Sequence, residues 1–361
     1  MQAITRRRAF CRFFTRRKTY KISTETSKMN ETDNLGAAKN AGLGFCLENI
    51  NERNIKNAAA FIKRYEKMAM GLSSQFVEAL TLLKKGRVIS ARRIMGNLYM
   101  VRQNEEIFGL FALSTGGTLF HCFPSLCQAC NFGAGTSAPD NEDFYENAGF
   151  SDEKYFLPLK KLLQPLFVQN QVYGMIGEAR STAMFAAIFG RKPSCQRTYF
   201  FMEQLNSSDE NSFLDKKLQN AVQFCPCAPK DKEKLYLLQQ GYEIEEVLPP
   251  GSEHDPESCL KNLEIALKKQ QVFAIYIAGA AVAKTGTNAQ GFNHCQIGGV
   301  YTLPNYRGKG LAGFGICRLC SVLKEQNKKP VLFVKTHNLP AQKAYLKAGF
   351  VFTGKFNIFY F

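Results

Sequence analysis

The segment from Asn305 to Gly315, NYRGKGLAGFG, contains two basic residues and four glycines. It follows a short β-favouring run, Cys295 to Thr302, which Pro304 ends. Apolar or small residues at helical spacing then predict a helix that begins near Gly310 or Leu311. We call residues 305–315 the glycine-rich loop. The pattern predicts that this loop connects the end of a strand to the start of a helix.

The glycine-rich loop has the properties of an anion-binding site. Amide N–H groups in the first turn of a helix lack partners within the helix, and the helix dipole favours negative charge there. Gly308 and Gly310 allow close approach of the backbone, and Arg307 and Lys309 add positive charge. A flexible surface loop has a similar composition, but the strand before it and the helix after it favour binding. We therefore expect the loop to bind a phosphate or pyrophosphate.

A second motif follows in THNLPAQKAYLKAGF, residues 336–350. Asn338 is a suitable N-cap for a helix, Pro340 suits its first turn, and Gly349 is suited to end it. Asn338, Ala341 and Tyr345 then lie on one face of that helix, at positions i, i+3 and i+7. A cap and a core tyrosine would produce the same pattern without any function, so the motif gains meaning from the glycine-rich loop before it.

The elements that position these motifs follow from hydrophobic periodicity. Residues 49–85 predict two helices broken near Gly71, and residues 107–123 predict a β-hairpin that turns at Gly116 and Gly117. Residues 171–203 predict strand, helix and strand, and the last sixty residues repeat that order. The repeated order suggests two copies of one fold in tandem.

The two motifs together resemble the GCN5-related N-acetyltransferases (GNAT). The acyl-CoA loop of that family has the pattern Q/R-x-x-G-x-G/A, which residues Arg307 to Ala312 meet. Its later helix has the form N-x-x-A-x-x-x-Y-x-x-x-G-F, which residues 338–350 meet. The resemblance covers residues 272–361 and is closest to tandem-domain members with a divergent first domain. No such loop occurs before Gln204, so only the second copy is expected to hold acyl-CoA.

The resemblance implies an α/β fold made of two tandem GNAT-like domains, each a mixed, mostly antiparallel sheet flanked by helices. We place the domains at 29–205 and 231–361, with a linker at 206–230 and a basic disordered tail at 1–28. The implied activity is transfer of an acetyl group from acetyl-CoA to a primary amine by direct attack. The implied ligands of acetyl-CoA are Val300, Tyr301, Thr302, Arg307, Gly308, Lys309, Gly310, Leu311, Ala312, Asn338 and Ala341.

The resemblance assigns Tyr345 as the general acid and leaves the general base open. Gln296 stands near the position where some relatives have a glutamate. His294, two residues earlier, has a suitable intrinsic pKa and is our candidate, although a surface histidine at a strand start is an equal alternative. Glu253 and His254 are further candidates in a charged loop, and a chain of water molecules is another.

Composition limits the class of protein. The 361 residues carry a formal charge of +17, and eight of the basic residues lie within the first 24 residues, which contain no acid. Arg12 interrupts the apolar residues of this tail, so we expect no secretory signal, and Met29 offers an alternative start. No apolar run approaches the roughly 20 residues that span a bilayer. We expect no nucleic-acid binding beyond the tail, and residual basicity favours an acidic acceptor.

Twelve cysteines at irregular spacing predict reduced thiols in a cytoplasmic protein. His121, Cys122, Cys127 and Cys130 are close in sequence, but small buried or loop thiols explain them better than a metal site, and we expect no metal. Two other functions remain open. The chain could be a non-catalytic acyl-CoA sensor or interaction module, or an aminoacyl-tRNA-dependent transferase of the same fold. The oligomeric state and the acceptor are not predicted.

Overall fold

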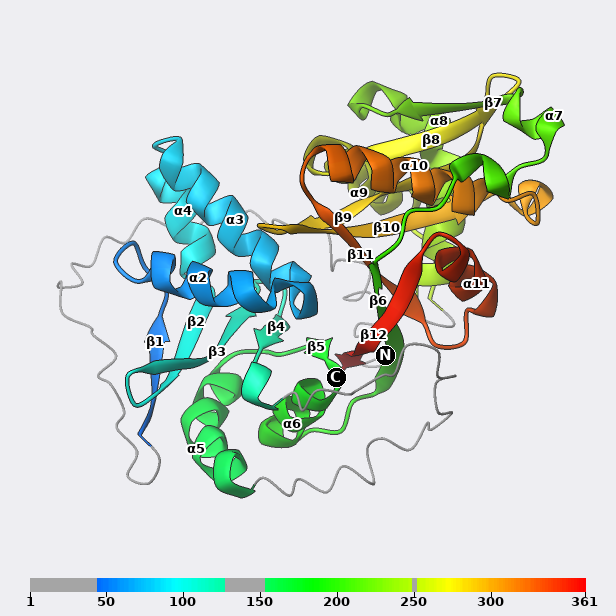
Figure 1. The fold of residues 1–361 in the computed structure, drawn as a ribbon. Helices are drawn as coiled ribbons and strands as arrows, with labels where there is room; N and C mark the ends of the chain where they lie inside the picture. The colour runs from blue at the N-terminus through cyan, green and yellow to red at the C-terminus, as the bar shows by residue number, and fades with distance from the viewer. Residues whose placement is uncertain (1–43, 127–152, 249–251) are drawn as a thin grey trace.

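One twelve-stranded sheet passes through both halves of the chain in a computed structural model, which describes residues 44–126, 153–248 and 252–361. The predicted tail at 1–28 and the residues Cys127 and Cys130 lie outside the described residues. The strand order is β1-β2-β3-β4-β5-β12-β6-β11-β10-β9-β8-β7, so strands from the two halves meet at its centre (Figure 1).

The described residues of the N-terminal half, 44–126 and 153–204, supply six strands and five α-helices. A β-hairpin forms at the predicted place, with β3 and β4 paired antiparallel, and β4 and β5 pair in parallel. The strands are β1 (Phe45–Asn49), β2 (Leu98–Gln103), β3 (Glu106–Leu113), β4 (Thr118–Cys122), β5 (Gly174–Glu178) and β6 (Cys195–Gln204). The helices are α2 (Ile55–Tyr65), α3 (Met70–Lys84), α4 (Val88–Met95), α5 (Glu153–Gln169) and α6 (Ala179–Phe189).

The C-terminal half, residues 206–361, repeats this plan, and β10 and β11 form its parallel pair. Its strands are β7 (Val222–Pro226), β8 (Val272–Ile277), β9 (Ala280–Gln290), β10 (His294–Thr302), β11 (Lys329–Lys335) and β12 (Phe350–Tyr360). Its helices are α7 (Lys216–Gln219), α8 (Lys232–Tyr242), α9 (Pro256–Lys269), α10 (Leu311–Glu325) and α11 (Leu339–Lys347). A π-helical turn, η6 (Glu243–Val247), continues α8.

The final strand of each half lies within the other half of the sheet. Strand β6 pairs with β11 and β12, and β12 pairs with β5 and β6, all antiparallel. Each half therefore completes its sheet with a strand that belongs to the other half in sequence. Figure 1 shows β6 and β12 side by side between the two halves. This exchange joins the halves by main-chain hydrogen bonds as well as by side-chain packing.

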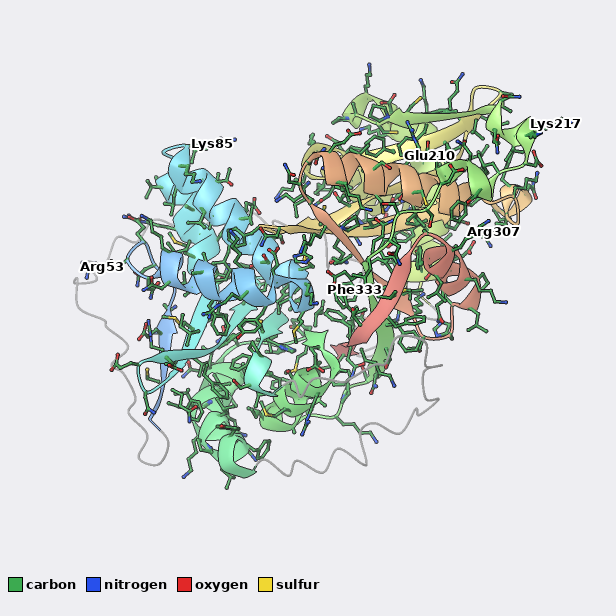
Figure 2. All side chains as sticks on the ribbon, in the orientation of Figure 1. Arg53, Lys85, Glu210, Lys217, Arg307 and Phe333 are labelled. Carbon is green, nitrogen blue, oxygen red and sulfur yellow. The ribbon has the colours of Figure 1, made fainter. Side chains whose placement is uncertain are left out.

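Helices cover both faces of the sheet in each half. In the N-terminal half, α2, α3 and α4 pack on one face and α5 and α6 on the other, around two separate apolar clusters. In the C-terminal half, α10 and α11 pack on one face and α8 and α9 on the other. Phe333 lies at the junction of the halves (Figure 2), with its ring centroid 4.1 Å from that of Phe356 and 5.2 Å from that of Phe201.

Two local predictions meet a different structure. Gly71 lies inside α3, and the helices are separated earlier, at residues 66–69; a Cβ at Gly71 would lie 2.9 Å from the ring of Phe120, so glycine lets α3 approach β4. The segment 206–230, predicted as a linker, contains the edge strand β7, which pairs with β8.

Among the described residues, no helix is long and apolar enough to cross a membrane.

Candidate active site

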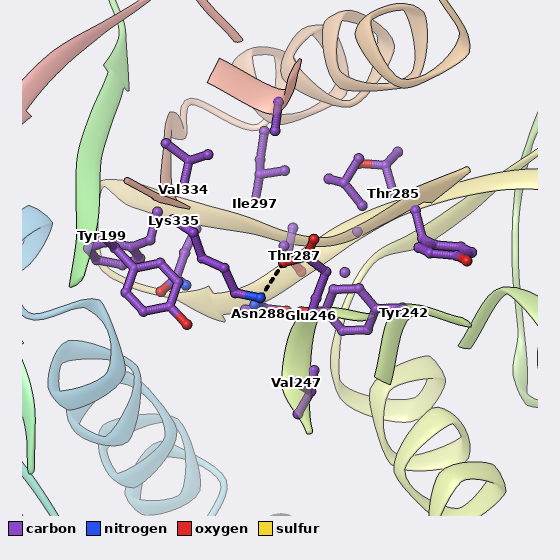
Figure 3. A pocket seen from close by; sticks show the side chains of 18 of the residues that line it. Tyr199, Tyr242, Glu246, Val247, Thr285, Thr287, Asn288, Ile297, Val334 and Lys335 are labelled. Atoms are coloured by element: carbon purple, nitrogen blue, oxygen red, sulfur yellow. Dashed lines mark ion pairs between the residues drawn. The ribbon is translucent and has the colours of Figure 1, made fainter. Parts of the chain in front are cut away.

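A cavity of about 1360 Å³ opens where β10 and β11 separate. These strands pair in parallel only as far as Ile297 and Leu332. Beyond that point, residues 298–302 of β10 and residues 333–335 of β11 both line the cavity, as Figure 3 shows for Val334 and Lys335. The N-terminal half adds an apolar wall that includes Phe120 and Ile176.

A bulge in β10 lies at the wall of this cavity. The pairing of β10 with β9 shifts register between Gly298 and Tyr301, and Gly299 has a φ of +63°. A Cβ at Gly298 would lie 2.0 Å from Nδ2 of Asn288, so a larger residue there would require the Asn288 side chain to move. A bulge leaves main-chain groups outside the ladder. The bulge therefore leaves main-chain groups near Val300 outside the ladder, at the residues that the family resemblance assigns to the pantetheine arm.

Lys284 of β9 supports the bulge from behind. Its side chain is 5% exposed, its Nζ donates a 2.7 Å hydrogen bond to the carbonyl oxygen of Gly299, and it lies 4.5 Å from the ring centroid of Tyr242. Burial lowers the pKa of Lys284 to about 8, although the charge of Glu243 opposes that shift. Sequence analysis did not single out this lysine, because an isolated lysine in a strand gives no signal of burial.

The glycine-rich loop lies at the cavity, and α10 begins directly after Gly310. Gly310 has a φ of +77°, and a Cβ on it would lie 1.9 Å from the carbonyl oxygen of Phe213. Gly308 has a φ of +74° with no described atom within 4 Å of such a Cβ. The N-cap Gly310 makes no side-chain hydrogen bond to the first turn of α10, whose amide groups lack partners within the helix. Of the predicted loop residues, Arg307, Gly308, Gly310, Leu311 and Ala312 line the cavity.

Lys309 of the same loop does not line the cavity. Its Nζ lies 5.1 Å from the ring centroid of Tyr306.

An acidic segment that sequence analysis missed reaches the loop. We call η6, Glu243–Val247, the acidic turn. Glu245 accepts hydrogen bonds from Nη2 of Arg307 at 2.9 and 2.8 Å and from the hydroxyl of Tyr301 at 2.6 Å. Partial burial opposes ionisation of Glu245, but these two donors hold its pKa below the ordinary value. The sequence EIEEV is the signal that could have located this segment, since three carboxylates so close together are typical of a binding edge.

Glu246 of the acidic turn meets the second motif. Its carboxylate lies 2.8 Å from Nζ of Lys335, the ion pair drawn in Figure 3, and accepts from Nδ2 of Asn338 at 3.3 Å. The same Asn338 accepts from the amide of Ala341 through Oδ1, which confirms the predicted N-cap of α11. Arg197 donates to the main-chain oxygens of residues 246–248 and fixes the turn against β6.

Tyr345 lines the cavity on the same face of α11 as Asn338 and Ala341. It is half-buried, and its ring centroid lies 6.2 Å from that of Phe350. Burial, and then the charges of Tyr242 and Glu246, raise the pKa of Tyr345 well above its ordinary value. The phenol is therefore protonated at neutral pH, which is the state that a proton donor needs. Predicted Val300, Tyr301 and Thr302 also line the cavity, and the buried Oγ1 of Thr302 has no partner in the described chain.

His294, our sequence candidate for the base, does not line the cavity. It lies at the start of β10, where Nδ1 is 2.7 Å from Oε1 of Glu66 and Nε2 is 3.8 Å from Oε1 of Glu203. Glu66 also accepts hydrogen bonds from the amides of residues 292–294. The histidine therefore joins Glu66, in the 3-10 turn after α2, and Glu203 of β6 to the start of β10, away from the residues that line the cavity.

The remaining candidates are placed as follows. Gln296 lines the cavity, and His254 lies beside Glu243 behind it. Cys122 is buried among the helices on one face of the N-terminal sheet, whereas His121 contacts Thr182 of α6 on the other face. Adjacent residues of a strand point to opposite faces, so His121 and Cys122 do not share a ligand. The nine described cysteines are all free.

Comparison with known proteins agrees with this geometry. The profile of the acetyltransferase (GNAT) family matches residues 235–350. This segment is a GNAT domain. It contains the bulge, the glycine-rich loop and α11 with Tyr345, so the family match and the cavity coincide. No curated protein matches the chain.

Solved structures extend the likeness beyond the GNAT domain. A Drosophila protein of 11% identity has a TM-score of 0.53, with 87% of this chain and 98% of that chain covered, which shows the fold alone. A GCN5-related N-acetyltransferase from Sphaerobacter thermophilus has 13% identity, a TM-score of 0.48 and coverage of 87% and 94%. A protein from Novosphingobium aromaticivorans has 20% identity and a TM-score of 0.35. The match covers 46% of this chain and 65% of the Novosphingobium chain, so this chain spans about two thirds of that relative's length.

Proposed function

We propose that the GNAT domain transfers an acetyl group from acetyl-CoA to a primary amine by direct attack, without an acyl-enzyme. One observation carries the proposal: a single cavity brings together the first turn of α10, the bulge of β10 and Tyr345. A site for coenzyme A needs an anion-binding end, an extended main-chain edge and a proton donor, and these three features supply them.

The residues present suit acetyl-CoA. Gly310 caps α10 without a side chain and packs against the carbonyl of Phe213, and Thr302 has a buried Oγ1 without a partner in the described chain. When bound, acetyl-CoA supplies a thioester that is already activated. In our proposal, the α10 amides and Arg307 hold its pyrophosphate, and the backbone of residues 300–302 pairs with its pantetheine arm. An amide of the bulge polarises the thioester carbonyl.

Proton transfer requires a donor and an acceptor in the same cavity. We assign the donor to Tyr345, whose raised pKa keeps it protonated for the leaving thiolate. Because His294 is remote, we assign the acceptor to Glu246, which lies at the cavity between Lys335 and Asn338. The amine acceptor enters from the side of the acidic turn and the N-terminal half. Its identity, and the cytoplasmic location expected from free thiols, stay predictions.

The test combines binding with turnover. Acetyl-CoA is titrated into the full chain by calorimetry, and release of the CoA thiol is followed with a panel of amines that includes amines bearing carboxylate or phosphate. Tyr345→Phe should lower kcat by about 10²- to 10⁴-fold and leave acetyl-CoA affinity unchanged. Glu246→Gln should lower kcat similarly, and Tyr99→Phe, in β2 of the N-terminal half, is the matched control.

The outcomes separate the competing functions. Absence of acetyl-CoA binding by the wild-type chain would remove the acetyltransferase proposal. Saturable binding without turnover, unaffected by Tyr345→Phe, would instead indicate an acyl-CoA sensor. Turnover that requires aminoacyl-tRNA in place of acetyl-CoA would indicate the tRNA-dependent transferase.

A further inference from the structure

A buried cluster at the wall of the cavity brings together three side chains from separate segments, of which Glu243 lines the cavity. Glu243 follows α8, His254 precedes α9, and Cys259 lies in the first turn of α9. The ligand atoms of the three residues all lie within 4.8 Å of one another. Glu243 is 8% exposed and Cys259 is fully buried. A carboxylate, an imidazole and a thiol are three groups that bind zinc in proteins.

The distance between His254 and Glu243 suits an ion better than a hydrogen bond, whereas the thiol of Cys259 hydrogen-bonds to the Glu243 carboxylate. Nε2 of His254 lies 3.9 Å from Oε2 of Glu243, which is too long for a hydrogen bond. That nitrogen is buried and has no hydrogen-bond partner among the described residues. Two ligands of a tetrahedral zinc ion, each about 2.1 Å from the metal, lie about 3.4 Å apart. A small approach of the two side chains would therefore place both within reach of one ion.

The surrounding residues orient Glu243 for such a role. Nε2 of Gln239 and Nδ2 of Asn262 both donate to Oε1 of Glu243, at 2.9 and 3.3 Å. Their donation leaves Oε2 directed toward His254. Hydrogen bonds of this kind commonly hold the carboxylate ligands of metals in place. The buried Oδ1 of Asn262 is itself without a partner in the described chain, so it or a water molecule can complete a fourth position.

Charge balance also favours a divalent cation. Binding would replace the thiol proton of Cys259 with the metal, so that one proton is released and the thiolate and carboxylate together neutralise a 2+ ion.

We propose that Glu243, His254 and Cys259 bind one Zn²⁺ ion that joins α8, α9 and the loop between them. Glu243 is the first residue of the acidic turn, whose Glu245 and Glu246 face the glycine-rich loop and Asn338. An ion at this place therefore fixes the carboxylates of the cavity wall. The sequence did not predict this site, since its residues are separated by eleven and five positions that match no common zinc motif.

The experiment uses the full chain without an affinity tag, stripped with a chelator and dialysed. Zinc bound after addition of the metal alone is measured by mass spectrometry, and Co²⁺ is titrated as a spectroscopic probe. The expected result is about one equivalent of Zn²⁺ per chain, and a thiolate-to-cobalt charge-transfer band with the visible bands of a tetrahedral site. Calorimetry in two buffers of different ionisation enthalpy should show release of about one proton at pH 7.

Variants locate the metal. Cys259→Ser should abolish the charge-transfer band, and His254→Gln should weaken Co²⁺ affinity by roughly 100-fold. Cys46→Ser is the matched control, because its free thiol lies in β1 at the opposite end of the sheet. If circular dichroism shows that Cys259→Ser does not fold, the Co²⁺ affinity of His254→Gln tests the proposal instead. His254 lies at the edge of the cluster, so its substitution should disturb the fold less. Uptake below about a tenth of an equivalent, or uptake that His254→Gln leaves unchanged, would overturn the proposal.

Discussion

Arg307 directs one guanidinium nitrogen at both carboxylate oxygens of Glu245, at 2.9 and 2.8 Å. Its Nε donates to the carbonyl oxygen of Thr302 at 3.0 Å, so the side chain lies along the end of β10. The cation expected to meet a pyrophosphate is therefore paired with a carboxylate from the acidic turn. Any anionic ligand at the glycine-rich loop must compete with Glu245 for this arginine.

Glu245→Gln should consequently strengthen acetyl-CoA binding. Both side chains are nearly half exposed, and exposed ion pairs contribute about 0.2–1 kcal/mol, which corresponds to about a 1.4- to 5-fold lower Kd. Calorimetric titration of acetyl-CoA measures the change. Glu210→Gln is the matched control, because Glu210 forms a similar 2.8 Å pair with Arg318 outside the cavity. Unchanged or weaker binding in Glu245→Gln would contradict competition at Arg307.

Gly310→Ala should reduce acetyl-CoA affinity beyond its effect on stability. A positive φ costs a non-glycine residue about 1–2 kcal/mol, and alanine at this position also meets the carbonyl of Phe213 at 1.9 Å. The start of α10 must then shift, which moves the amides that hold the anion. Gly86→Ala isolates the backbone cost, because its φ is +69° with no described atom near a Cβ. Thermal melting and calorimetric titration of acetyl-CoA are compared for the two variants. Equal losses of acetyl-CoA affinity in both would contradict anion binding at the glycine-rich loop.

The contact of His294 with Glu66 and Glu203 should make the stability of the chain depend on pH. The neighbouring His294 imidazole, against the opposing effect of burial, holds the pKa of Glu203 at about 2. Burial by itself would lower the pKa of His294 and raise the pKa of Glu66. The hydrogen bond between the two side chains outweighs burial, so the pKa of His294 is raised and the pKa of Glu66 is lowered. The stability from the carboxylates is present above their unfolded pKa of 4.5 and is lost as pH falls through the lowered values.

The contribution of His294 to stability depends on pH in the opposite direction to that of the carboxylates. It is complete below the unfolded pKa of 6.5 and is lost as pH rises through the raised folded value. Stability from this contact should therefore be greatest between about pH 4.5 and 6.5. His294→Gln should lower the free energy of unfolding by about 1–3 kcal/mol in that range and by less at pH 9. Urea denaturation at several pH values measures this, with exposed His337→Gln as control; a uniform loss at every pH would contradict the ionic contact.

Asn338 has two contacts that substitution can separate. Asn338→Ala removes the N-cap of α11 and should cost about 1 kcal/mol of unfolding free energy. Asn338→Ser retains a capping oxygen but cannot reach Glu246, so its stability should stay within a few tenths of the wild type. Urea denaturation compares the two variants, and equal destabilisation by both would show that the contact with Glu246 matters more than the cap.

Much of the local structure followed from sequence patterns. The hairpin between β3 and β4, the strand, helix and strand of residues 171–203, and the start of α10 at Leu311 were predicted from turn residues and hydrophobic periodicity. The cap at Asn338 was predicted in the same way. These features depend on residues within one or two turns of each other, where propensity and capping act directly. The His294 candidate failed to reach the cavity, because proximity in sequence to β10 does not determine which end of the strand meets the ligand.

The sequence by itself determined the glycine-rich loop, the helix that carries Tyr345 and the alternation of strands and helices, since each depends on nearby residues. Only the tertiary structure decided that β6 and β12 exchange places, that His294 joins Glu66 to Glu203, and that Glu245 meets Arg307. Sixty-two positions separate Glu245 from Arg307, and 228 separate Glu66 from His294. Such contacts form when the packing of distant elements offsets the entropy of closing long loops, which no local pattern records.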